Sequence, residues 1–132
     1  MKKIIEVPDV SAALRSLKTP TSLLIQAGGL LYSCGIPPID PLTGAIVKGD
    51  IGEQTHAVFR IMKLALAAAG SCLDEVIKTT IFVTDPTQMA EVNAVYRTYF
   101  PNEQPVRSFV AVKEWPFAFD IEIDFVATAG PA

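Results

Sequence analysis

A single arginine stands in an apolar run, Pro105-Val106-Arg107-Ser108-Phe109-Val110-Ala111-Val112, whose β-branched residues predict a strand. A charged side chain in such a strand needs a partner, because burying an unpaired charge is costly. The planar guanidinium can hold a carboxylate through two parallel hydrogen bonds. Arg107 is therefore a candidate for binding the carboxylate of a small ligand. The alternative is a salt bridge between subunits, with Glu122 as a candidate partner.

The last predicted strand, residues 119–128, carries acidic side chains on one face only, because successive residues of a strand point to opposite sides. Its apolar face holds Phe119, Ile121, Ile123, Phe125 and Ala127, and its acidic face holds Asp120, Glu122 and Asp124. A glutamate in a cleft can accept a proton from a water molecule or hold that water for attack. Glu122 is therefore a candidate catalytic residue. The alternative is a solvated acidic face, which we expect for Asp120 and Asp124.

The elements that must position these side chains follow from turn and capping signals. Gly28-Gly29 joins two apolar runs as a β-hairpin. A long helix begins at Asp50, where Glu53 completes a capping box, and ends at Gly70. A second helix begins with Asp85 at the N-cap, Pro86 at the first position and Gln88 at the third, and Pro101 stops it. Its apolar stripe is predicted to be Met89, Val92, Tyr96 and Tyr99 or Phe100.

The predicted strands are residues 1–7, 22–26, 30–34, 76–84, 106–112 and 119–128, with a helical turn at 10–14. Two helices can cover one face of a mixed sheet, which predicts an α+β fold. The opposite face, which carries Glu122, is then left for solvent or for another subunit. We expect one domain over residues 1–132, because neither a repeat nor a low-complexity stretch interrupts the chain.

The composition excludes several function classes. Half of the residues are hydrophobic (50%) and only 19% are charged, so the chain can bury a core, and some of its apolar surface is expected to lie in subunit contacts. The net charge of -3 and the lack of a lysine and arginine cluster argue against a nucleic-acid partner. We find neither a signal peptide nor an apolar run of roughly 20 residues, so we expect a cytoplasmic protein without a membrane span. One histidine and two separated cysteines give no zinc spacing, and we expect neither a metal nor a cofactor.

Over residues 19–127 the chain resembles the RidA (YjgF) family of deaminases that act on 2-imino acids and 2-aminoacrylate. The most specific motif is Pro105-Val106-Arg107-Ser108 followed by Ile121-Glu122-Ile123. The supporting motifs are Ser33-Cys34-Gly35 with Ile36-Pro37, the turn Asp40-Pro41-Leu42-Thr43-Gly44, the run Lys78-Thr79-Thr80-Ile81-Phe82-Val83, and Val92-Asn93-Ala94-Val95-Tyr96. The resemblance implies a chorismate-mutase-like α+β fold, with two helices packed on one face of a mixed β-sheet. It also implies a homotrimer with active sites in clefts between subunits.

Several site residues carry over by this resemblance. Arg107 matches the family's carboxylate-binding arginine, and Glu122 matches the glutamate that positions or activates water. Asn93 and Gly35 match residues that line the family's cleft. At three further positions that line the cleft, the chain departs from the family. Cys34 stands where many members have serine or threonine, Phe109 where many have cysteine, and Thr21 where many have a tyrosine that closes over the substrate.

The implied reaction is the hydrolytic deamination of a carboxylate-bearing enamine or imine to a 2-keto acid and ammonia. Thr21 in place of tyrosine would open the site and favour a larger unsaturated amino acid, such as an aminomuconate. A second reading is a non-enzymatic trimer that binds small carboxylates, although pure binding has less need for Glu122. A third is RNA cleavage, against which the acidic pI of about 5.0 counts.

Overall fold

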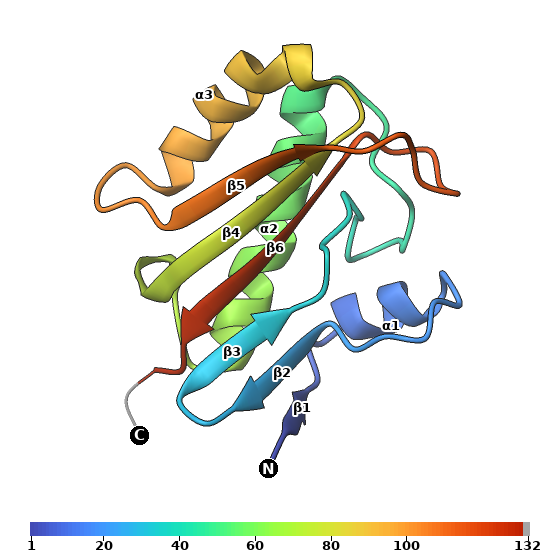
Figure 1. The fold of residues 1–132 in the computed structure, drawn as a ribbon. Coiled ribbons are helices and arrows are strands. Elements are labelled where there is room, and N and C mark those ends of the chain that lie inside the picture. Colours follow the sequence, from blue (N-terminus) through green and yellow to red (C-terminus); the bar gives the residue numbers. More distant parts are fainter. Residues whose placement is uncertain (131–132) are drawn as a thin grey trace.

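In the computed structural model, which describes residues 1–130, the chain forms a mixed sheet of six strands (Figure 1). The strands are β1 (Lys3–Ile5), β2 (Leu24–Ala27), β3 (Leu30–Ser33), β4 (Val76–Val83), β5 (Val106–Ala111) and β6 (Ile121–Thr128). They lie in the order β1-β2-β3-β6-β4-β5, in which β4 and β5 are parallel and every other neighbouring pair is antiparallel. The last strand of the chain therefore lies inside the sheet, between β3 and β4.

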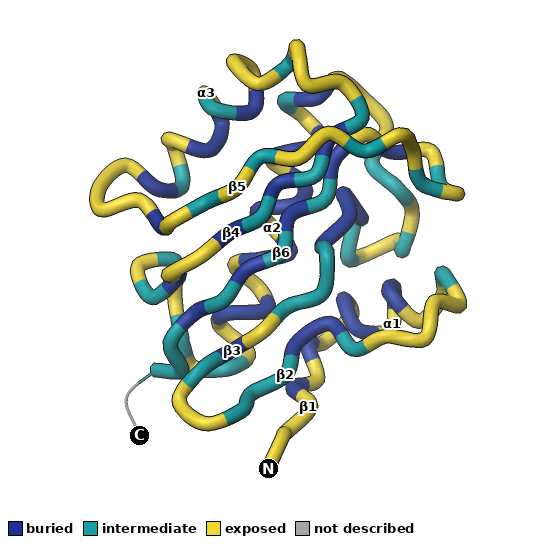
Figure 2. Tube along the Cα trace, viewed as in Figure 1, coloured by how far each residue is buried: buried dark blue, intermediate teal, exposed yellow. Residues whose placement is uncertain are grey.

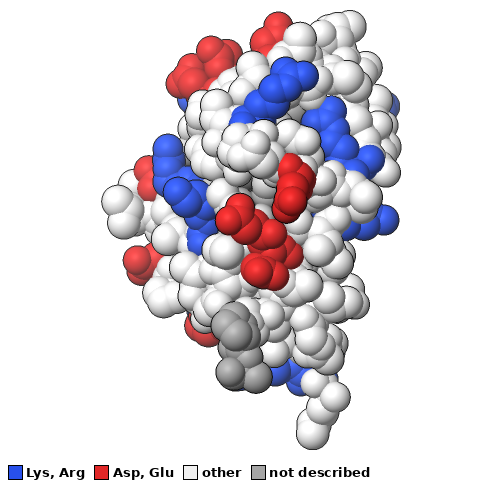
Figure 3. Space-filling view, turned by 90° about the vertical axis from the view of Figure 1, so that its left-hand side faces the viewer, with Lys and Arg blue, Asp and Glu red and all other residues white. Residues whose placement is uncertain are grey.

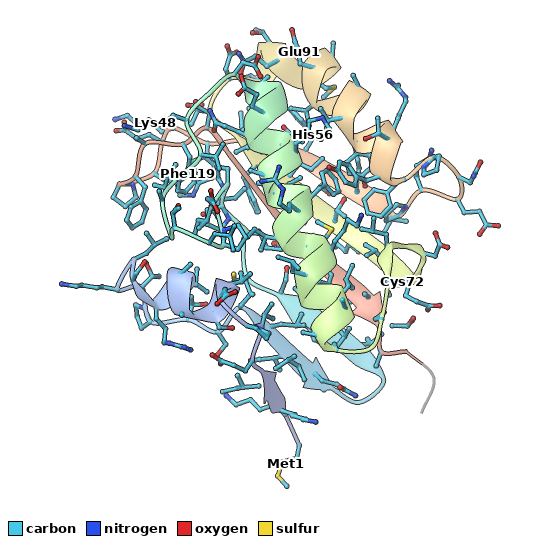
Figure 4. All side chains as sticks on the ribbon, turned by 180° about the vertical axis from the view of Figure 1, so that it is seen from behind. Met1, Lys48, His56, Cys72, Glu91 and Phe119 are labelled. Atoms are coloured by element: carbon cyan, nitrogen blue, oxygen red, sulfur yellow. The ribbon has the colours of Figure 1, made fainter. Side chains whose placement is uncertain are left out.

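Helices cover one face of this sheet. The α-helices are α1 (Val10–Arg15), α2 (Ile51–Ala68) and α3 (Met89–Tyr99), and two single 3₁₀ turns are η1 (Leu73–Glu75) and η2 (Pro86–Gln88). Figure 1 views the sheet from its open face, with α2 behind the strands, and Figure 4 shows α2 and α3 in front of it. The α+β architecture predicted from the sequence, with two helices on one face of a mixed sheet, is confirmed. The short helix α1 adds a third helix at one end of the sheet (Figure 1).

The core lies between this sheet face and α2, where both elements are buried (Figure 2). The alternation of β6 is confirmed, because Phe119, Ile121, Ile123, Phe125 and Ala127 are each at most 4% exposed. Long β-branched and aromatic side chains from the strands interdigitate here with the apolar stripe of α2, which stabilises both layers.

The predicted capping box of α2 is present. The Asp50 side chain accepts a hydrogen bond from the Glu53 amide at 2.8 Å, and the Glu53 carboxylate accepts one from the Asp50 amide. The next residue, Gln54, ties this first turn to the start of β6. Its side-chain amide donates to the Asp120 carboxylate at 3.1 Å, and its side-chain oxygen accepts from the Asp120 amide at 2.8 Å. Asp120, which we expected to be only a solvated side chain, thus helps to hold the strand that carries Glu122.

Two local predictions for the second helix were wrong. Its first turn, at Pro86–Gln88, is a 3₁₀ turn, and the α-helix begins only at Met89. Asp85 still caps this turn, because its carboxylate accepts a hydrogen bond from the Thr87 amide. Met89 does not belong to the apolar stripe, since it is 40% exposed, whereas Val95 on the next turn is buried. The rest of the predicted stripe is buried, since Val92, Tyr96 and Phe100 are at most 4% exposed.

Candidate active site

Arg107 lies on the helix side of β5, next to α3. It pairs in register with Thr79, whose buried hydroxyl bonds to the Tyr96 hydroxyl of α3 at 2.9 Å. The Arg107 guanidinium lies over the Tyr96 ring, 4.9 Å from its centroid, and 5.8 Å from the centroid of Phe109. One of its nitrogens donates to Asn93 Oδ1 at 2.7 Å. The cation is thus held in place by two aromatic faces and one amide oxygen.

This arrangement leaves most of the guanidinium available to a ligand. A guanidinium carries five N–H donors. Within residues 1–130, Asn93 is the one hydrogen-bond acceptor of Arg107, and the ion pair between Arg15 and Glu6 does not involve it. A pocket of about 360 Å³ opens beside it. The pocket is large enough for a small carboxylate that binds to the remaining donors.

A second pocket, of about 190 Å³, contains Glu122 together with three other predicted site residues, Thr21, Cys34 and Gly35. The Glu122 carboxyl is half-buried here, and its pKa rises to about 7. The first cause is the loss of solvation, which disfavours the charged form, and the negative charge of Asp124 adds to it. A carboxyl with a pKa of about 7 can both accept and return a proton near neutral pH.

Cys34 and Gly35 shape this pocket without supplying a nucleophile. Burial first, and the charge of Glu122 second, raise the pKa of the Cys34 thiol to about 12, so the thiol is protonated at neutral pH. Gly35 lies directly against the Glu122 carboxylate, and a Cβ at this position would overlap it. Because it has no side chain, Gly35 leaves the space that the Glu122 carboxylate occupies.

Within one chain, the two pockets have no lining residue in common. Arg107 pairs with Thr79, whose side chain is buried beneath the helices, whereas Glu122 pairs with Phe82, which faces the other way. Strand β4 also lies between β5 and β6. A single chain therefore presents a cation on one side of the sheet and a proton acceptor on the other.

Comparison with known proteins fits these observations. The family model described as Endoribonuclease L-PSP matches residues 12–129. A RutC family protein from Pyrococcus horikoshii is 44% identical over 82% of this chain and 86% of its own length. A mouse protein named 2-iminobutanoate/2-iminopropanoate deaminase is 30% identical over 99% of this chain and 94% of its own length. A solved structure from Thermotoga maritima, described as a candidate endoribonuclease, has a TM-score of 0.89 and 37% identity, and covers 99% of this chain and 100% of its own.

The chain belongs to the RidA/YjgF family. Membership follows from the matched length, which includes every lining residue of both pockets. The fold that the resemblance implied is confirmed by the structural match. The family model and the mouse relative are named after two different activities, a nuclease and a deaminase, so membership alone does not identify the reaction.

The open face of the sheet carries exposed apolar side chains, an arrangement typical of a surface that contacts another subunit. In register across the sheet, Ile4 aligns with Ile25, Tyr32, Val126, Lys78 and finally Val106, so one lysine interrupts the apolar row. Ile4 is 58% exposed and Val106 is 69% exposed. This row crosses the same face that carries Glu122.

Charged side chains do not form a basic stripe on the face shown in Figure 3, where acidic and uncharged residues separate the lysines and arginines.

Among the described residues, no three histidine, cysteine or acidic side chains come together as metal ligands. In the same part of the chain, no helix is long and apolar enough to cross a membrane.

The sequence named some of the lining residues and missed others. Asn93 contacts Arg107 as a neighbour in the pocket, and Phe109 contacts the guanidinium but lines neither pocket. In the Arg107 pocket the sequence missed Tyr96, which we predicted only as a core residue. Residues three apart on a helix lie on the same face, so the spacing between Asn93 and Tyr96 could have indicated that Tyr96 also lines this pocket. The missed apolar residues of the Glu122 pocket are Leu14, Leu17, Pro37, Phe117 and Phe119.

Replacing Gly35 with alanine is expected to displace the Glu122 carboxylate. The atom in the way is the end of a flexible side chain, so the carboxylate turns out of the pocket and the free energy of unfolding changes by less than ~1 kcal/mol. Once solvated, the Glu122 carboxyl loses the main cause of its shift, and its pKa falls from about 7 toward the usual range. Carbon-13 NMR of the side-chain carboxyl measures this titration. The matched control is Gly29→Ala, where a Cβ meets no atom within 4 Å. A Glu122 pKa that stays at about 7 in Gly35→Ala would contradict this account.

Proposed function

We propose that this protein is a deaminase that hydrolyses 2-imino acids, and the enamines that tautomerise to them, to 2-keto acids and ammonia. The observation that carries the proposal is the pair of half-sites. One presents a guanidinium with unused donors, and the other presents a carboxyl whose pKa of about 7 suits proton transfer at neutral pH. The deaminase name of the mouse relative, which is 30% identical over nearly the whole chain, supports the same reaction.

Arg107 binds the substrate carboxylate in this proposal. The carboxylate takes two parallel hydrogen bonds from the guanidinium, which Asn93 and the Tyr96 ring hold in a fixed orientation. Fixing the carboxylate also fixes the adjacent imine carbon relative to the water that attacks it. Positioning of this kind contributes several kcal/mol to lowering a barrier, which is why we give Arg107 a catalytic role as well as a binding role.

Glu122 accepts and donates the protons of the reaction in this proposal. The imine reacts in its protonated, iminium form. As a carboxylate, Glu122 accepts a proton from water while the water oxygen bonds to the iminium carbon and the carbon–nitrogen double bond becomes single. The resulting carbinolamine carries a hydroxyl and an amino group on one carbon. Glu122 then returns the proton to the amino nitrogen and the carbon–nitrogen bond breaks. As ammonia leaves, the hydroxyl proton passes to Glu122 and the carbonyl of the 2-keto acid forms; Glu122 then releases this proton to the departing ammonia. The neutral Cys34 thiol takes no covalent part in these steps.

The complete site is assembled between subunits of a homotrimer in this proposal. A single chain holds its Arg107 and Glu122 on opposite sides of the sheet, so one substrate can reach both only if they come from different chains. The row from Ile4 to Val106, which is apolar except at Lys78, supports the proposal, because it provides a surface for subunit contact on the face that carries Glu122. The cytoplasmic location stays a prediction from the sequence.

The binding-only trimer is the weaker alternative. A protein that only binds carboxylates would gain nothing from a proton acceptor in an apolar pocket, where its charged form is disfavoured. The family description also names RNA cleavage. The face shown in Figure 3 has no basic groove that would bind RNA, which argues against this activity.

Replacing Arg107 with alanine is expected to lower the hydrolysis of 2-imino acids at least 100-fold, because both binding and positioning are lost, an effect of about 3 kcal/mol or more. An amino-acid oxidase generates the imine, semicarbazide traps it, and the protein competes with the trap. The matched control is Arg60→Ala, an exposed arginine on α2, which should act like the wild type. Full hydrolysis by Arg107→Ala would rule out this mechanism.

Mixing two inactive variants tests whether the site is shared. Trimers co-assembled from equal amounts of Arg107→Ala and Glu122→Gln contain some clefts with both native residues. Random assortment predicts about a quarter of wild-type activity, if each cleft takes the two residues from neighbouring chains. Mixtures that remain as inactive as the separate variants would show that the two residues do not meet between chains.

The activity is expected to fall on the acid side of neutral pH. Glu122 must be a carboxylate to accept the proton, and protonation below its pKa of about 7 removes the base, so kcat should fall by about tenfold per pH unit there. In Asp124→Asn the inflection should move to lower pH, because the neighbouring charge that raises the pKa of Glu122 is gone. Initial rates between pH 5 and 8 measure both, and identical profiles for the two proteins would contradict the assignment.

A further inference from the structure

We propose that Arg97 binds a second carboxylate of the substrate, so that the site prefers imines of dicarboxylic amino acids, above all those with the five-carbon chain of glutamate. This inference rests on the proposed function, because it names the substrate class of the same site. It follows from the charges, the spacing and the volume of the pocket beside Arg107.

Arg97 and Arg107 line the same pocket, although they come from different elements. Arg97 follows Asn93 by four residues on α3, so the two side chains lie on one face of the helix. Asn93 accepts the hydrogen bond of the Arg107 guanidinium at 2.7 Å. Helix α3 lies beside β5 at the edge of the sheet (Figure 1). The helix face that holds the first guanidinium therefore also presents the second.

Neither guanidinium has an acidic partner within residues 1–130. No aspartate or glutamate lines this pocket, and the ion pair in the described part of the chain joins Arg15 and Glu6. Arg97 lies in the last turn of α3, where a cation is favoured near the carbonyl end of a helix, but that preference does not require a pocket shared with another cation. Two like charges in one pocket repel each other. A ligand with two carboxylates compensates both cations, whereas a monocarboxylate compensates only one.

The spacing fits a short dicarboxylate. Residues four apart on a helix have their Cβ atoms about 5–6 Å apart, and Asn93 contacts Arg107 directly, so Arg97 begins about one helical turn from the first carboxylate site. In the glutamate chain, four carbon–carbon bonds of about 1.5 Å each separate the two carboxyl carbons and span roughly 5 Å. The shorter aspartate chain spans roughly 4 Å. The five-carbon chain therefore reaches both guanidinium groups with the least adjustment of the exposed Arg97 side chain.

The volume of the pocket is larger than a single carboxylate needs. A cavity of about 360 Å³ corresponds to roughly twelve water-sized volumes of about 30 Å³ each. The imine of glutamate, with about ten non-hydrogen atoms, fits this space. The imine of alanine has about six non-hydrogen atoms and, when it is bound to Arg107, does not extend to Arg97.

The test compares kcat/KM for the imines of glutamate and of 2-aminopentanoate, which has the same chain length and only one carboxylate. Amino-acid oxidases generate both imines, and the protein competes with semicarbazide for them. A hydrogen bond between charged groups changes affinity by about tenfold or more, so we expect the ratio of the glutamate imine to the 2-aminopentanoate imine to be at least tenfold. In Arg97→Ala this ratio should decrease at least tenfold, mainly through KM for the glutamate imine. In Arg97→Lys it should be intermediate, because lysine keeps the charge but cannot form two parallel hydrogen bonds.

Arg60→Ala is the matched control, because Arg60 is an exposed arginine on α2 that does not line the pocket, and its ratio should equal that of the wild type. A wild-type ratio of one or less, or a ratio that Arg97→Ala leaves unchanged, would overturn this inference while imine hydrolysis itself continues. An equal decrease in Arg60→Ala would also overturn it, because the preference would then depend on overall charge. Hydrolysis of neither imine would instead overturn the proposed function, and this inference with it.

Discussion

The position of β6 between β3 and β4 is the constraint on which the rest of the structure depends. A strand inside a sheet is hydrogen-bonded along both edges, and its side chains must alternate between two environments. In β6 one set fills the core under α2, so Glu122 and Asp124 must face the opposite side. Glu122 cannot turn to the helix side without moving Ile121 and Ile123 out of the core, which makes its direction as stable as the fold itself.

The same burial that fixes Glu122 also gives it a useful pKa. A carboxyl on a fully solvated strand face would be ionised near neutral pH and weakly basic. The apolar residues of α1 and of the β5–β6 connection remove water from this one, and its pKa rises to about 7. The absence of a side chain at Gly35 leaves the space in which this carboxylate lies, at the β3 end of the pocket. The acid–base properties of Glu122 thus originate in the apolar residues that line its pocket.

Local patterns in the sequence predicted the elements well, because alternation, capping and turn signals act over a few residues. The capping box at Asp50, the hairpin at Gly28-Gly29 and the two faces of β6 needed no tertiary information. The start of the second helix was misjudged, since the pattern could not show that Pro86–Gln88 would form a 3₁₀ turn.

The pockets were less accessible to this reasoning, because they join segments that are distant in the chain. The family motifs named Arg107, Glu122, Asn93 and Gly35, but no pattern placed Leu17 in the same pocket as Phe117, a hundred residues later. Their position in one pocket depends on how α1 and the β5–β6 connection pack at the end of the sheet. In these two segments, proteins of one fold can differ in sequence without a change in the sheet, because loops and short helices tolerate substitution better than buried strands.

The separation of Arg107 from Glu122 limits what one chain can do. Each half-site is stable alone: the guanidinium rests on Tyr96 and Asn93, and the carboxyl can remain protonated in its pocket. Had they faced each other within one chain, a salt bridge would have lowered the pKa of the carboxyl and occupied the guanidinium donors. Keeping them on opposite sides of a sheet preserves both the basicity of Glu122 and the free donors of Arg107. In the proposed function, one substrate contacts both residues. Its carboxylate binds to Arg107, and its imine carbon lies near the water that Glu122 deprotonates.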